Sequence, residues 1–349
     1  MRDQRKTDHI DIASKTKDGP LNTGFSDLHL INQSVPGLNM EDINLGLHFI
    51  SKELSYPVII NALTGGTEQA RRINRGLAEL AQKYGLAIAV GSQTIALDDP
   101  GLRDSFKVVR EINPDGLIIA NVGANSSVSD ALKAINMIEA DALQLHFNIP
   151  QELAMHEGDR DFRSVRNNVK AIVNESPVPV IAKEVGFGLS RESVSILYDC
   201  GVRYFDIGGS GGTNFISIET QRRGSHSSEM LEWGIPSAAS LGEICSLGLP
   251  LTVIASGGIR TSLDASRALA MGADLVGIAG PLLKIFLREG IDKLNSWTDE
   301  FLYSLKAVFL MNAAKDLQEI KQHPLIITGF TAEWLRARGI DPLRWSSRQ

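Results

Sequence analysis

Residues 251–280 read LTVIASGGIRTSLDASRALAMGADLVGIAG, and this stretch decides the fold class. An apolar run leads into a Gly-Gly pair, a segment with helical spacing of apolar residues follows, and a second apolar run closes the stretch. This order is typical of a parallel strand–helix–strand unit. Both apolar runs are nearly continuous, as expected for strands buried on both faces of a parallel sheet. The stretch therefore predicts an α/β protein.

The same alternation recurs along the chain. Apolar spacing predicts a helix that ends at Gly85, and Ser190 is predicted to cap another that ends before Gly201. Eight such repeats predict a (β/α)8 TIM barrel. A doubly wound open sheet is the alternative, but it would carry a G-x-G-x-x-G fingerprint, which Gly65-Gly66-Thr67 does not match. The predicted strands are 58–62, 86–90, 117–120, 142–145, 178–182, 204–207, 251–255 and 275–279.

The barrel prediction divides the single domain into three parts. Residues 1–57 form an N-terminal extension, residues 58–290 the barrel and residues 291–349 a C-terminal helical extension. The connection after the sixth strand is the longest, and its polar, Gly-rich part at 208–228 is interpreted as a lid rather than a disordered insertion. Apolar spacing from Phe301 to Phe309 predicts a helix that packs on the barrel or on a neighbouring subunit.

Composition excludes several classes of protein. Among 349 residues, 35 basic against 41 acidic side chains leave a net charge of −6, which argues against nonspecific nucleic-acid binding. No apolar run reaches the roughly 18 residues of a membrane span, and the N-terminus is no signal peptide, so we expect a soluble cytoplasmic protein. Cys200 and Cys245 lie in predicted helices and are interpreted as buried apolar residues.

The active face of a barrel is built from residues that follow the strands. Gly257-Gly258 and Ala279-Gly280 follow the last two strands, where backbone N–H groups can bind a phosphate at a helix N-terminus. Gly211-Gly212-Thr213 can add further donors. These positions predict a phosphate-bearing cofactor, with flavin mononucleotide (FMN) favoured.

Lys183 ends the fifth predicted strand, where a buried lysine is unusual. It is a Schiff-base lysine, a phosphate ligand or a cation that stabilises a reduced flavin, and we favour the third interpretation. A salt bridge to Glu184 or to another carboxylate is the alternative. It is less favoured because adjacent residues of a strand point to opposite faces.

The fourth strand carries the most distinctive polar cluster. Gln144, His146 and Asn148 alternate, and Gln151 and Glu152 follow Pro150. Such a cluster can bind a Mg²⁺-bridged diphosphate, with a carboxylate oxygen from Glu152 on the metal and hydrogen bonds from the other side chains. No Cys/His set for zinc is present.

Arg5-Lys6 is a small basic group in an acidic protein. Terminal charges are usually solvated and mobile. The alternative is an arm that folds over the barrel mouth and neutralises an anionic substrate.

Taken together, these motifs resemble type 2 isopentenyl-diphosphate delta-isomerases, the FMN-dependent form. The resemblance runs from residue 5 to Thr328-Gly329. One departure is Thr94, where the family often has Arg, so a diphosphate contact is either missing or supplied by Arg222 or Arg223. The motifs that carry the resemblance are Arg5-Lys6 with Asp8-His9-Ile10, Thr64-Gly65-Gly66, Gly91-Ser92-Gln93, Gln144-x-His146-x-Asn148 with Pro150-Gln151-Glu152, Lys183-Glu184-x-Gly186, Gly208-Gly209-x-Gly211-Gly212-Thr213, Ser256-Gly257-Gly258-Ile259-Arg260, and Ala279.

The resemblance implies an isomerase that interconverts isopentenyl and dimethylallyl diphosphate, with FMN reduced by NADPH or NADH, Mg²⁺, and a homotetramer or homo-octamer. The implied metal ligand is Glu152, and the implied catalytic residues are Gln151, His146 and Lys183. Implied substrate contacts are Arg5, Lys6, His146, Asn148 and Gln151. Implied FMN contacts are Ala62, Leu63, Thr64, Ser92, Asn121, Lys183, Thr213, Gly257, Gly258, Ala279 and Gly280.

An amide does not titrate near neutral pH, so Gln151 is not an ordinary general acid. The hypothesis is that N5 of reduced FMN carries the proton while Gln151 and His146 orient the substrate. One rival is an FMN-dependent 2-hydroxy-acid oxidase or dehydrogenase, for which neither His226 nor Arg260 has a suitable neighbourhood. A nucleotide dehydrogenase with a loop cysteine is also disfavoured. A non-catalytic flavin-binding protein would leave the strand-four cluster and Arg5-Lys6 unexplained.

Overall fold

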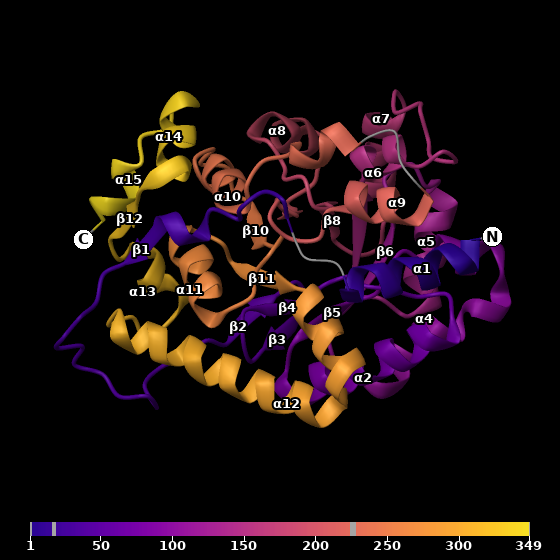
Figure 1. Cartoon of the computed structure of the whole chain (residues 1–349). Helices are drawn as coiled ribbons and strands as arrows, with labels where there is room; N and C mark the ends of the chain where they lie inside the picture. Colours follow the sequence, from indigo (N-terminus) through magenta and orange to yellow (C-terminus); the bar gives the residue numbers. More distant parts are fainter. Residues whose placement is uncertain (1, 16–18, 224–227, 349) are drawn as a thin grey trace.

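A closed barrel of eight parallel strands forms the centre of the computed structural model, as predicted (Figure 1). The structure describes residues 2–15, 19–223 and 228–348; of residues 2–7, 223 and 228 it describes the backbone alone. Each strand pairs with the next along the chain, and β11 closes the barrel on β4. The barrel strands are β4 (Val58–Ile60), β5 (Ala87–Ala89), β6 (Ile118–Gly123), β7 (Ala142–Phe147), β8 (Val180–Glu184), β9 (Tyr204–Asp206), β10 (Thr252–Ala255) and β11 (Leu275–Ile278).

Helices in the connections surround the barrel, and two of their ends, at Gly85 and Ser190, follow the predicted signals. The Thr67 side chain caps the first connecting helix, and Gly85 ends it with a left-handed φ of 62°. The Ser190 side chain likewise accepts the N–H of Ser193. The connecting helices are α2 (Glu68–Tyr84), α3 (Thr94–Asp98), α4 (Asp104–Ile112), α5 (Val128–Met137), α6 (Ile149–Ala154), α7 (Val165–Glu175), α8 (Arg191–Asp199), α9 (Phe215–Arg223), α10 (Ser237–Cys245) and α11 (Ser262–Met271), with short 3₁₀ turns η2 (Pro100–Leu102) and η3 (Ser228–Glu232).

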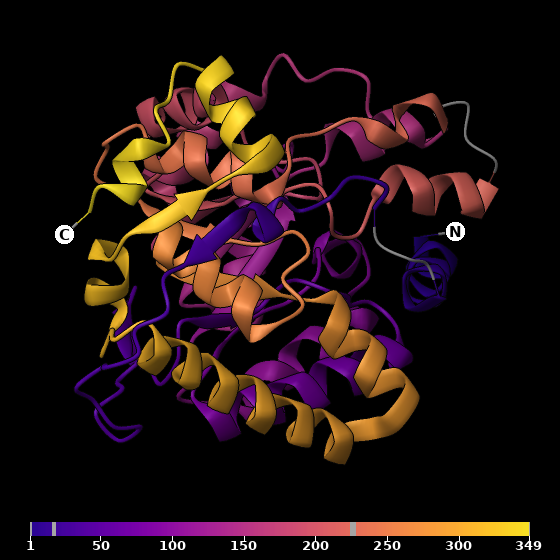
Figure 2. The same cartoon turned by 60° about the vertical axis from the view of Figure 1, so that its left-hand side comes forward.

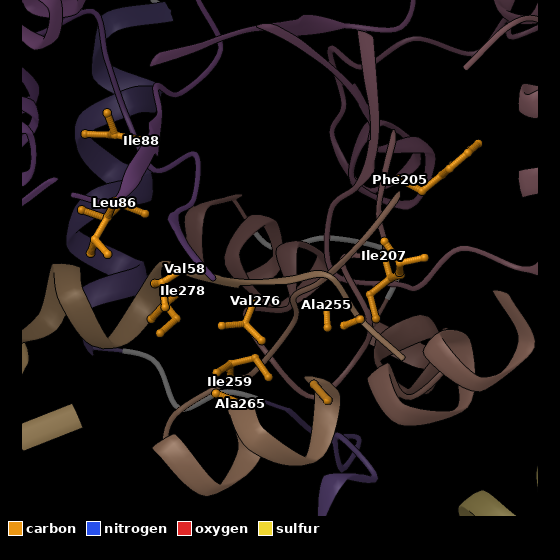
Figure 3. Packing of buried hydrophobic residues seen from close by; sticks show 14 of the residues in the cluster. Val58, Leu86, Ile88, Phe205, Ile207, Ala255, Ile259, Ala265, Val276 and Ile278 are labelled. Atoms are coloured by element: carbon orange, nitrogen blue, oxygen red, sulfur yellow. The ribbon is translucent and has the colours of Figure 1, made fainter. Parts of the chain in front are cut away.

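Alternation along the strands divides the core into two parts. Ile59 packs inside the barrel, whereas Val58 and Ile60 pack outside it against the helices. Figure 3 shows such outward residues, among them Val58 and Ile278, with helical residues such as Ala265. Burial on both strand faces explains why the sequence of each strand is continuously apolar.

A hairpin of β2 (Leu47–Phe49) and β3 (Lys52–Leu54) closes the N-terminal end of the barrel. Phe49 and Leu54 belong to the interior cluster, and the Phe49 ring meets the Tyr204 ring edge-on at 5.9 Å. Phe49 and Leu54 thus extend the apolar interior of the barrel at this end.

The C-terminal part packs on the outside of the barrel (Figures 1 and 2). Helix α12 (Gly280–Met311) bends at Gly290, and buried Phe301, Leu305 and Phe309 anchor its second half. Strand β12 (Leu325–Ile327) pairs antiparallel with β1 (Leu28–Leu30) of the N-terminal part, next to η1 (Phe25–Asp27). The remaining helices are α13 (Leu317–Gln322), α14 (Gly329–Ala337) and α15 (Leu343–Ser346).

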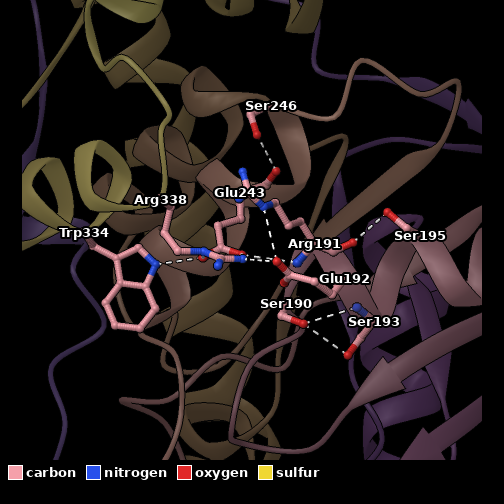
Figure 4. Close-up of polar contacts among 9 residues, drawn as sticks. All are labelled: Ser190, Arg191, Glu192, Ser193, Ser195, Glu243, Ser246, Trp334 and Arg338. Atoms are coloured by element: carbon pink, nitrogen blue, oxygen red, sulfur yellow. Dashed lines mark hydrogen bonds and ion pairs between the residues drawn. The ribbon is translucent and has the colours of Figure 1, made fainter.

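One buried carboxylate ties the C-terminal segment to the barrel (Figure 4). Glu243 on α10 accepts from Trp334 Nε1 and from Arg338 Nε, both at 2.8 Å, and from the backbone N–H of Arg191. Only 1% of Glu243 is exposed. A buried charge of this kind is stable only when it is paired and hydrogen-bonded, so these contacts define how α14 sits on the barrel.

The segment after β9 differs from the prediction of a polar, Gly-rich loop over residues 208–228, because helix α9 (Phe215–Arg223) lies within it. It contains α9, η3 and α10, and α9 packs against α6 and the N-terminal helix α1 (Arg2–Lys15). Buried Ile216 and Ile218 are two residues apart, which is not helical spacing, so sequence periodicity does not reveal α9. Cys200 is buried as predicted, whereas Cys245 is only partly buried. Among the described residues, no helix is both long and apolar enough to cross a membrane.

Candidate active site

A cavity of about 980 Å³ opens at the C-terminal ends of the strands. All fifteen predicted site residues whose side chains are described line it: Ala62, Leu63, Thr64, Ser92, Asn121, His146, Asn148, Gln151, Glu152, Lys183, Thr213, Gly257, Gly258, Ala279 and Gly280. The other two, Arg5 and Lys6, lie on α1, but their side chains are outside the described part. Residues His9, Ile10 and Ala13 of the same helix also line the cavity, so α1 lies against its mouth.

The inward-facing residues of the strands change from apolar to polar where the strands reach the cavity. Along β8, inward-facing Ile181 is followed two residues later by Lys183, and along β9 Tyr204 is followed by Asp206. The same step occurs from Ile59 to Asn61, Ile119 to Asn121, Ala142 to Gln144, and Ile254 to Ser256. Because inward positions recur every second residue, this change places a polar layer directly above the apolar one.

Hydrogen bonds join this polar layer into one network. Asn61 Nδ2 donates to Asp206 at 2.6 Å, and Gln144 Nε2 donates to Asn61 Oδ1 at 3.1 Å. Asn121 Nδ2 in turn donates to Gln144 Oε1 at 3.1 Å, and Asn121 Oδ1 lies 2.8 Å from His146 Nδ1. Ser256 also donates to Asp206. Full pairing of buried polar groups makes such a network rigid.

The sequence interpretation of Lys183 needs a correction, because the disfavoured salt bridge is present. Lys183 Nζ lies 3.0 Å from Asp206 Oδ2, and the Asp206 side chain is completely buried. The two residues are register partners on neighbouring parallel strands, so both point into the barrel. The sequence analysis allowed Glu184 or another carboxylate as the partner, but its argument against a salt bridge applied to Glu184 alone, and Asp206 is the other carboxylate. The ion pair does not exclude the flavin interpretation, since Lys183 also lines the cavity.

The Gly-rich loops form a cradle of closely packed backbone. Gly257 and Gly258 have φ of 94° and 89°, and a Cβ on Gly212 would lie 2.7 Å from the Gly258 nitrogen. Helix α12 begins beside them at Gly280, and the residue before it, Ala279, provides no side-chain cap for the first N–H groups. Uncapped N–H groups at a helix start are suited to a phosphate, so the cradle fits the phosphate end of FMN.

A second feature fits the flavin ring. The Thr64 hydroxyl is buried, lines the cavity and has no hydrogen-bond partner among the residues that the structure describes. An unpaired buried hydroxyl in a native site calls for a partner such as a ligand or water. The donor set of Thr64, Asn121 and Lys183 is therefore compatible with a polar heterocycle.

The strand-four cluster lies in the same cavity. Asn148 Nδ2 donates to Glu152 Oε1 at 2.9 Å and to Gln151 Oε1 at 3.2 Å, and Glu152 Oε2 accepts the N–H of Asp159. In the described part of the chain, no three His, Cys, Asp or Glu residues form a metal cluster. One carboxylate is sufficient for Mg²⁺ when substrate phosphates and water provide the other ligands, so Glu152 fits that role.

Glu219 on α9 connects three elements and was missed by the sequence analysis. Its Oε1 lies 2.7 Å from His9 Nε2 on α1 and accepts from Gln151 Nε2 on α6 at 3.4 Å. Arg222 donates to its other oxygen at 2.7 Å. Burial raises the pKa of Glu219, but His9 and Arg222 outweigh this effect and lower the net pKa. The contact with His9 spans 210 residues, which no sequence spacing reveals.

Of the two residues proposed to replace an arginine at position 94, the structure describes the side chain of Arg222 alone. Arg222 is held by Glu219 at 2.7 Å and by Glu157 at 2.8 Å, so its charge is already paired. The Arg223 side chain and all of His226 lie outside the described part. Arg260 lines the cavity and donates to the carbonyls of Gly258 and Gly211. Thr94 itself shares a hydrogen bond with Ser92.

Glu184 lies next to Lys183 but on the other face of β8. It is buried and accepts the backbone N–H groups of Phe187 and Gly188. Burial raises the pKa of Glu184 to about 8, although these two hydrogen bonds act in the opposite direction. The folded protein therefore holds a proton on Glu184 at pH values where the unfolded chain has released it.

This difference predicts a pH-dependent stability. Because the pKa rises from 4.5 in the unfolded chain to about 8 on folding, the folded state binds more protons between these values. The contribution of Glu184 to the free energy of unfolding is complete below about pH 4.5 and is lost as the pH rises to about 8. We expect Glu184→Gln to reduce this pH-dependent loss of stability. Urea unfolding between about pH 4.5 and pH 8 measures it. The exposed Glu300→Gln is the control and should leave the decline unchanged.

Comparisons with known proteins agree with this geometry. Residues 117–327 match the model of the FMN-dependent dehydrogenase family. Isopentenyl-diphosphate delta-isomerase of Symbiobacterium thermophilum is 45% identical, with 100% of this chain and 99% of that protein covered. The protein of the same name from Moorella thermoacetica is 47% identical, with 97% of each covered.

Solved structures support the fold alone. A putative lactate oxidase of Pediococcus acidilactici superimposes with a TM-score of 0.68 at 16% identity, with 94% of each chain covered. A mandelate oxidase superimposes with a TM-score of 0.66 at 12% identity, with 94% of this chain and 98% of that one covered.

Fold and cavity thus define a TIM barrel of the FMN-dependent dehydrogenase class. Within that class, the chain belongs to the isopentenyl-diphosphate delta-isomerase family.

Proposed function

We propose that this protein interconverts isopentenyl and dimethylallyl diphosphate with reduced FMN and Mg²⁺. One observation carries the proposal: the glycine cradle with Lys183 and the cluster from His146 to Glu152 line a single cavity. A phosphate cofactor and a metal-bound diphosphate would therefore lie side by side. The full-length identity to named isomerases supports the same assignment.

The reaction moves a double bond by adding one proton and removing another, so it involves no net oxidation. Reduced FMN, when bound, supplies the electron-rich group that carries protons. Gly257, Gly258 and the start of α12 would hold its phosphate, and Lys183 would stabilise the negative charge of its reduced ring.

Residues of the strand-four cluster would hold the substrate. Glu152 would bind Mg²⁺, and His146 and Asn148 would donate hydrogen bonds to the diphosphate. Gln151, held by Asn148 and Glu219, would orient the alkene. The partly buried position of this cluster would reduce the contact of the reacting carbons with bulk water.

The deciding experiment is an isomerisation assay under anaerobic conditions with FMN-loaded protein, Mg²⁺ and isopentenyl diphosphate, with and without NADPH. Product that requires NADPH, the proposed reductant, supports the assignment. Oxygen-dependent oxidation of lactate or glycolate without isomerisation would instead favour a 2-hydroxy-acid oxidase. Light scattering on the same sample tests the proposed homotetramer or homo-octamer.

Gln151→Asn is expected to lower kcat by about 10²-fold, because a shortened side chain displaces the amide from its position between Asn148 and Glu219. FMN affinity should remain unchanged, since Gln151 is not part of the glycine cradle. Turnover and FMN fluorescence titration measure the two effects. Gln221→Asn makes the same change on an exposed surface and is the control. Equal loss of turnover and FMN affinity would contradict this placement.

Glu152→Gln is expected to raise the Mg²⁺ concentration for half-maximal activity by about 10- to 100-fold, because the amide is a weaker ligand than the carboxylate. The flavin spectrum should stay the same, and excess Mg²⁺ should restore part of the activity. An unchanged Mg²⁺ requirement would assign the metal to other residues.

A further inference from the structure

Asp206 is a completely buried charge that lies behind the cavity wall, in contact with Lys183, Asn61 and Ser256 of the lining, and neither the motifs nor the proposed mechanism uses it. Its exposure is 0%, yet it contacts four side chains: Lys183 at 3.0 Å, Asn61 at 2.6 Å, Gln144 at 3.4 Å, and Ser256. A carboxylate at the centre of a polar network orients all the groups around it.

Asp206 acts electrostatically on Lys183, which it contacts directly; this is the first of two routes by which it influences the site. Because the two charges lie 3.0 Å apart, the negative charge of Asp206 offsets much of the positive charge that Lys183 presents to the cavity. A reduced flavin beside Lys183 would therefore lie in the electrostatic field of the Lys183–Asp206 ion pair rather than in that of an isolated cation.

The other route leads to His146 through three amides. An ionised carboxylate only accepts hydrogen bonds, so Asn61 and Gln144 must turn their NH₂ groups toward Asp206. The oxygen of Asn61 then accepts from Gln144, and the oxygen of Gln144 accepts from Asn121. Every donor in this chain points toward Asp206.

The last amide determines the histidine tautomer. Since Asn121 uses its NH₂ group on Gln144, its oxygen faces His146, and Nδ1 must therefore carry a proton. A second proton on the ring would then sit on Nε2, which makes the imidazole a cation while Nδ1–H stays on Asn121. A cation of this kind is suited to a diphosphate.

We propose that Asp206 is a positioning residue that acts on both groups: it offsets the charge of Lys183 and, through Asn61, Gln144 and Asn121, places the proton of His146 on Nδ1. The inference rests on the proposed FMN site. According to this inference, Asp206 controls the reduction of the flavin and the protonation of His146, although it is not among the substrate or cofactor contacts.

The test uses the full-length, FMN-loaded protein without substrate. Asp206→Asn leaves the charge of Lys183 uncompensated, so reduced FMN should bind about tenfold more tightly relative to oxidised FMN. For a two-electron couple this is a rise of about 30 mV in midpoint potential. The same substitution permits the amides to turn, so histidine-selective ¹⁵N NMR should show loss of the Nδ1–H form. His146→Gln identifies the His146 signals.

A second variant separates the two routes. Gln144→Met interrupts the amide chain and leaves the Asp206–Lys183 pair in place, so it should change the His146 signals without moving the potential. This variant also provides a test if Asp206→Asn does not fold. Asp141→Asn removes a carboxylate that is paired with Arg110 at 2.7 Å, at the opposite end of β7, and should change neither property.

A folded Asp206→Asn protein with an unchanged potential or unchanged His146 signals would overturn the inference. So would a Gln144→Met protein that shifts the potential as far as Asp206→Asn does. Failure of the proposed function is distinguishable, because the wild-type chain would then fail to take up FMN or to isomerise the substrate.

Discussion

Lys183→Met is expected to lower the free energy of unfolding by about 3–5 kcal/mol, because it leaves Asp206 buried without its cationic partner. Turnover of the FMN-loaded variant should fall by about 10²- to 10³-fold, the range typical for loss of one group that stabilises developing negative charge. Urea unfolding and anaerobic isomerisation measure the two effects separately.

The double variant Lys183→Met/Asp206→Asn is the decisive comparison. Removal of both charges leaves no buried ion unpaired, so the double variant should regain much of the lost stability while its turnover stays low. If the single variant unfolded at the same urea concentration as the wild type, the pair would contribute nothing to folding. Full activity of the single variant would remove Lys183 from the mechanism.

Gly257→Ala is expected to abolish FMN binding. A Cβ at this position would lie 2.1 Å from the carbonyl oxygen of Gly209, and the φ of 94° is unfavourable for any residue with a side chain. Since both obstacles are backbone, the loop after β10 must move and the cradle must open. The strain lowers stability by about 1–3 kcal/mol. FMN fluorescence titration and thermal unfolding measure the outcome.

Gly280→Ala is the matched control from the same cradle. A Cβ on Gly280 meets no atom within 4 Å, so alanine fits at the start of α12. FMN affinity should therefore remain within a few fold of the wild type, because the backbone N–H groups are unchanged. Wild-type FMN affinity in Gly257→Ala would show that the phosphate binds elsewhere.

Most of the barrel could be predicted from local patterns. All eight strands were found because burial on both faces makes each one continuously apolar, and Gly85 and Ser190 mark helix ends through local backbone geometry. The predicted site residues share one cavity because a parallel barrel brings the ends of its strands to one face.

Other parts of the site could not be predicted in this way. Asp206 was included in an apolar strand, although its position two residues after inward-facing Tyr204 was a usable signal. Glu219 lies on α9, whose buried apolar residues Ile216 and Ile218 lack helical spacing, and its contact with His9 joins distant parts of the chain. Arg222 was considered for the substrate because sequence does not show that two carboxylates already hold it.

By itself, the sequence determined the barrel, its order of strands and the cavity-lining positions at the strand ends, because these depend on periods of two and 3.6 residues and on short-range turn chemistry. Only the tertiary structure decided which charges meet: Lys183 with Asp206, and Glu219 with His9 and Gln151. The physical reason is that electrostatic pairing depends on distance in space, which is set by strand register and helix packing rather than by separation along the chain.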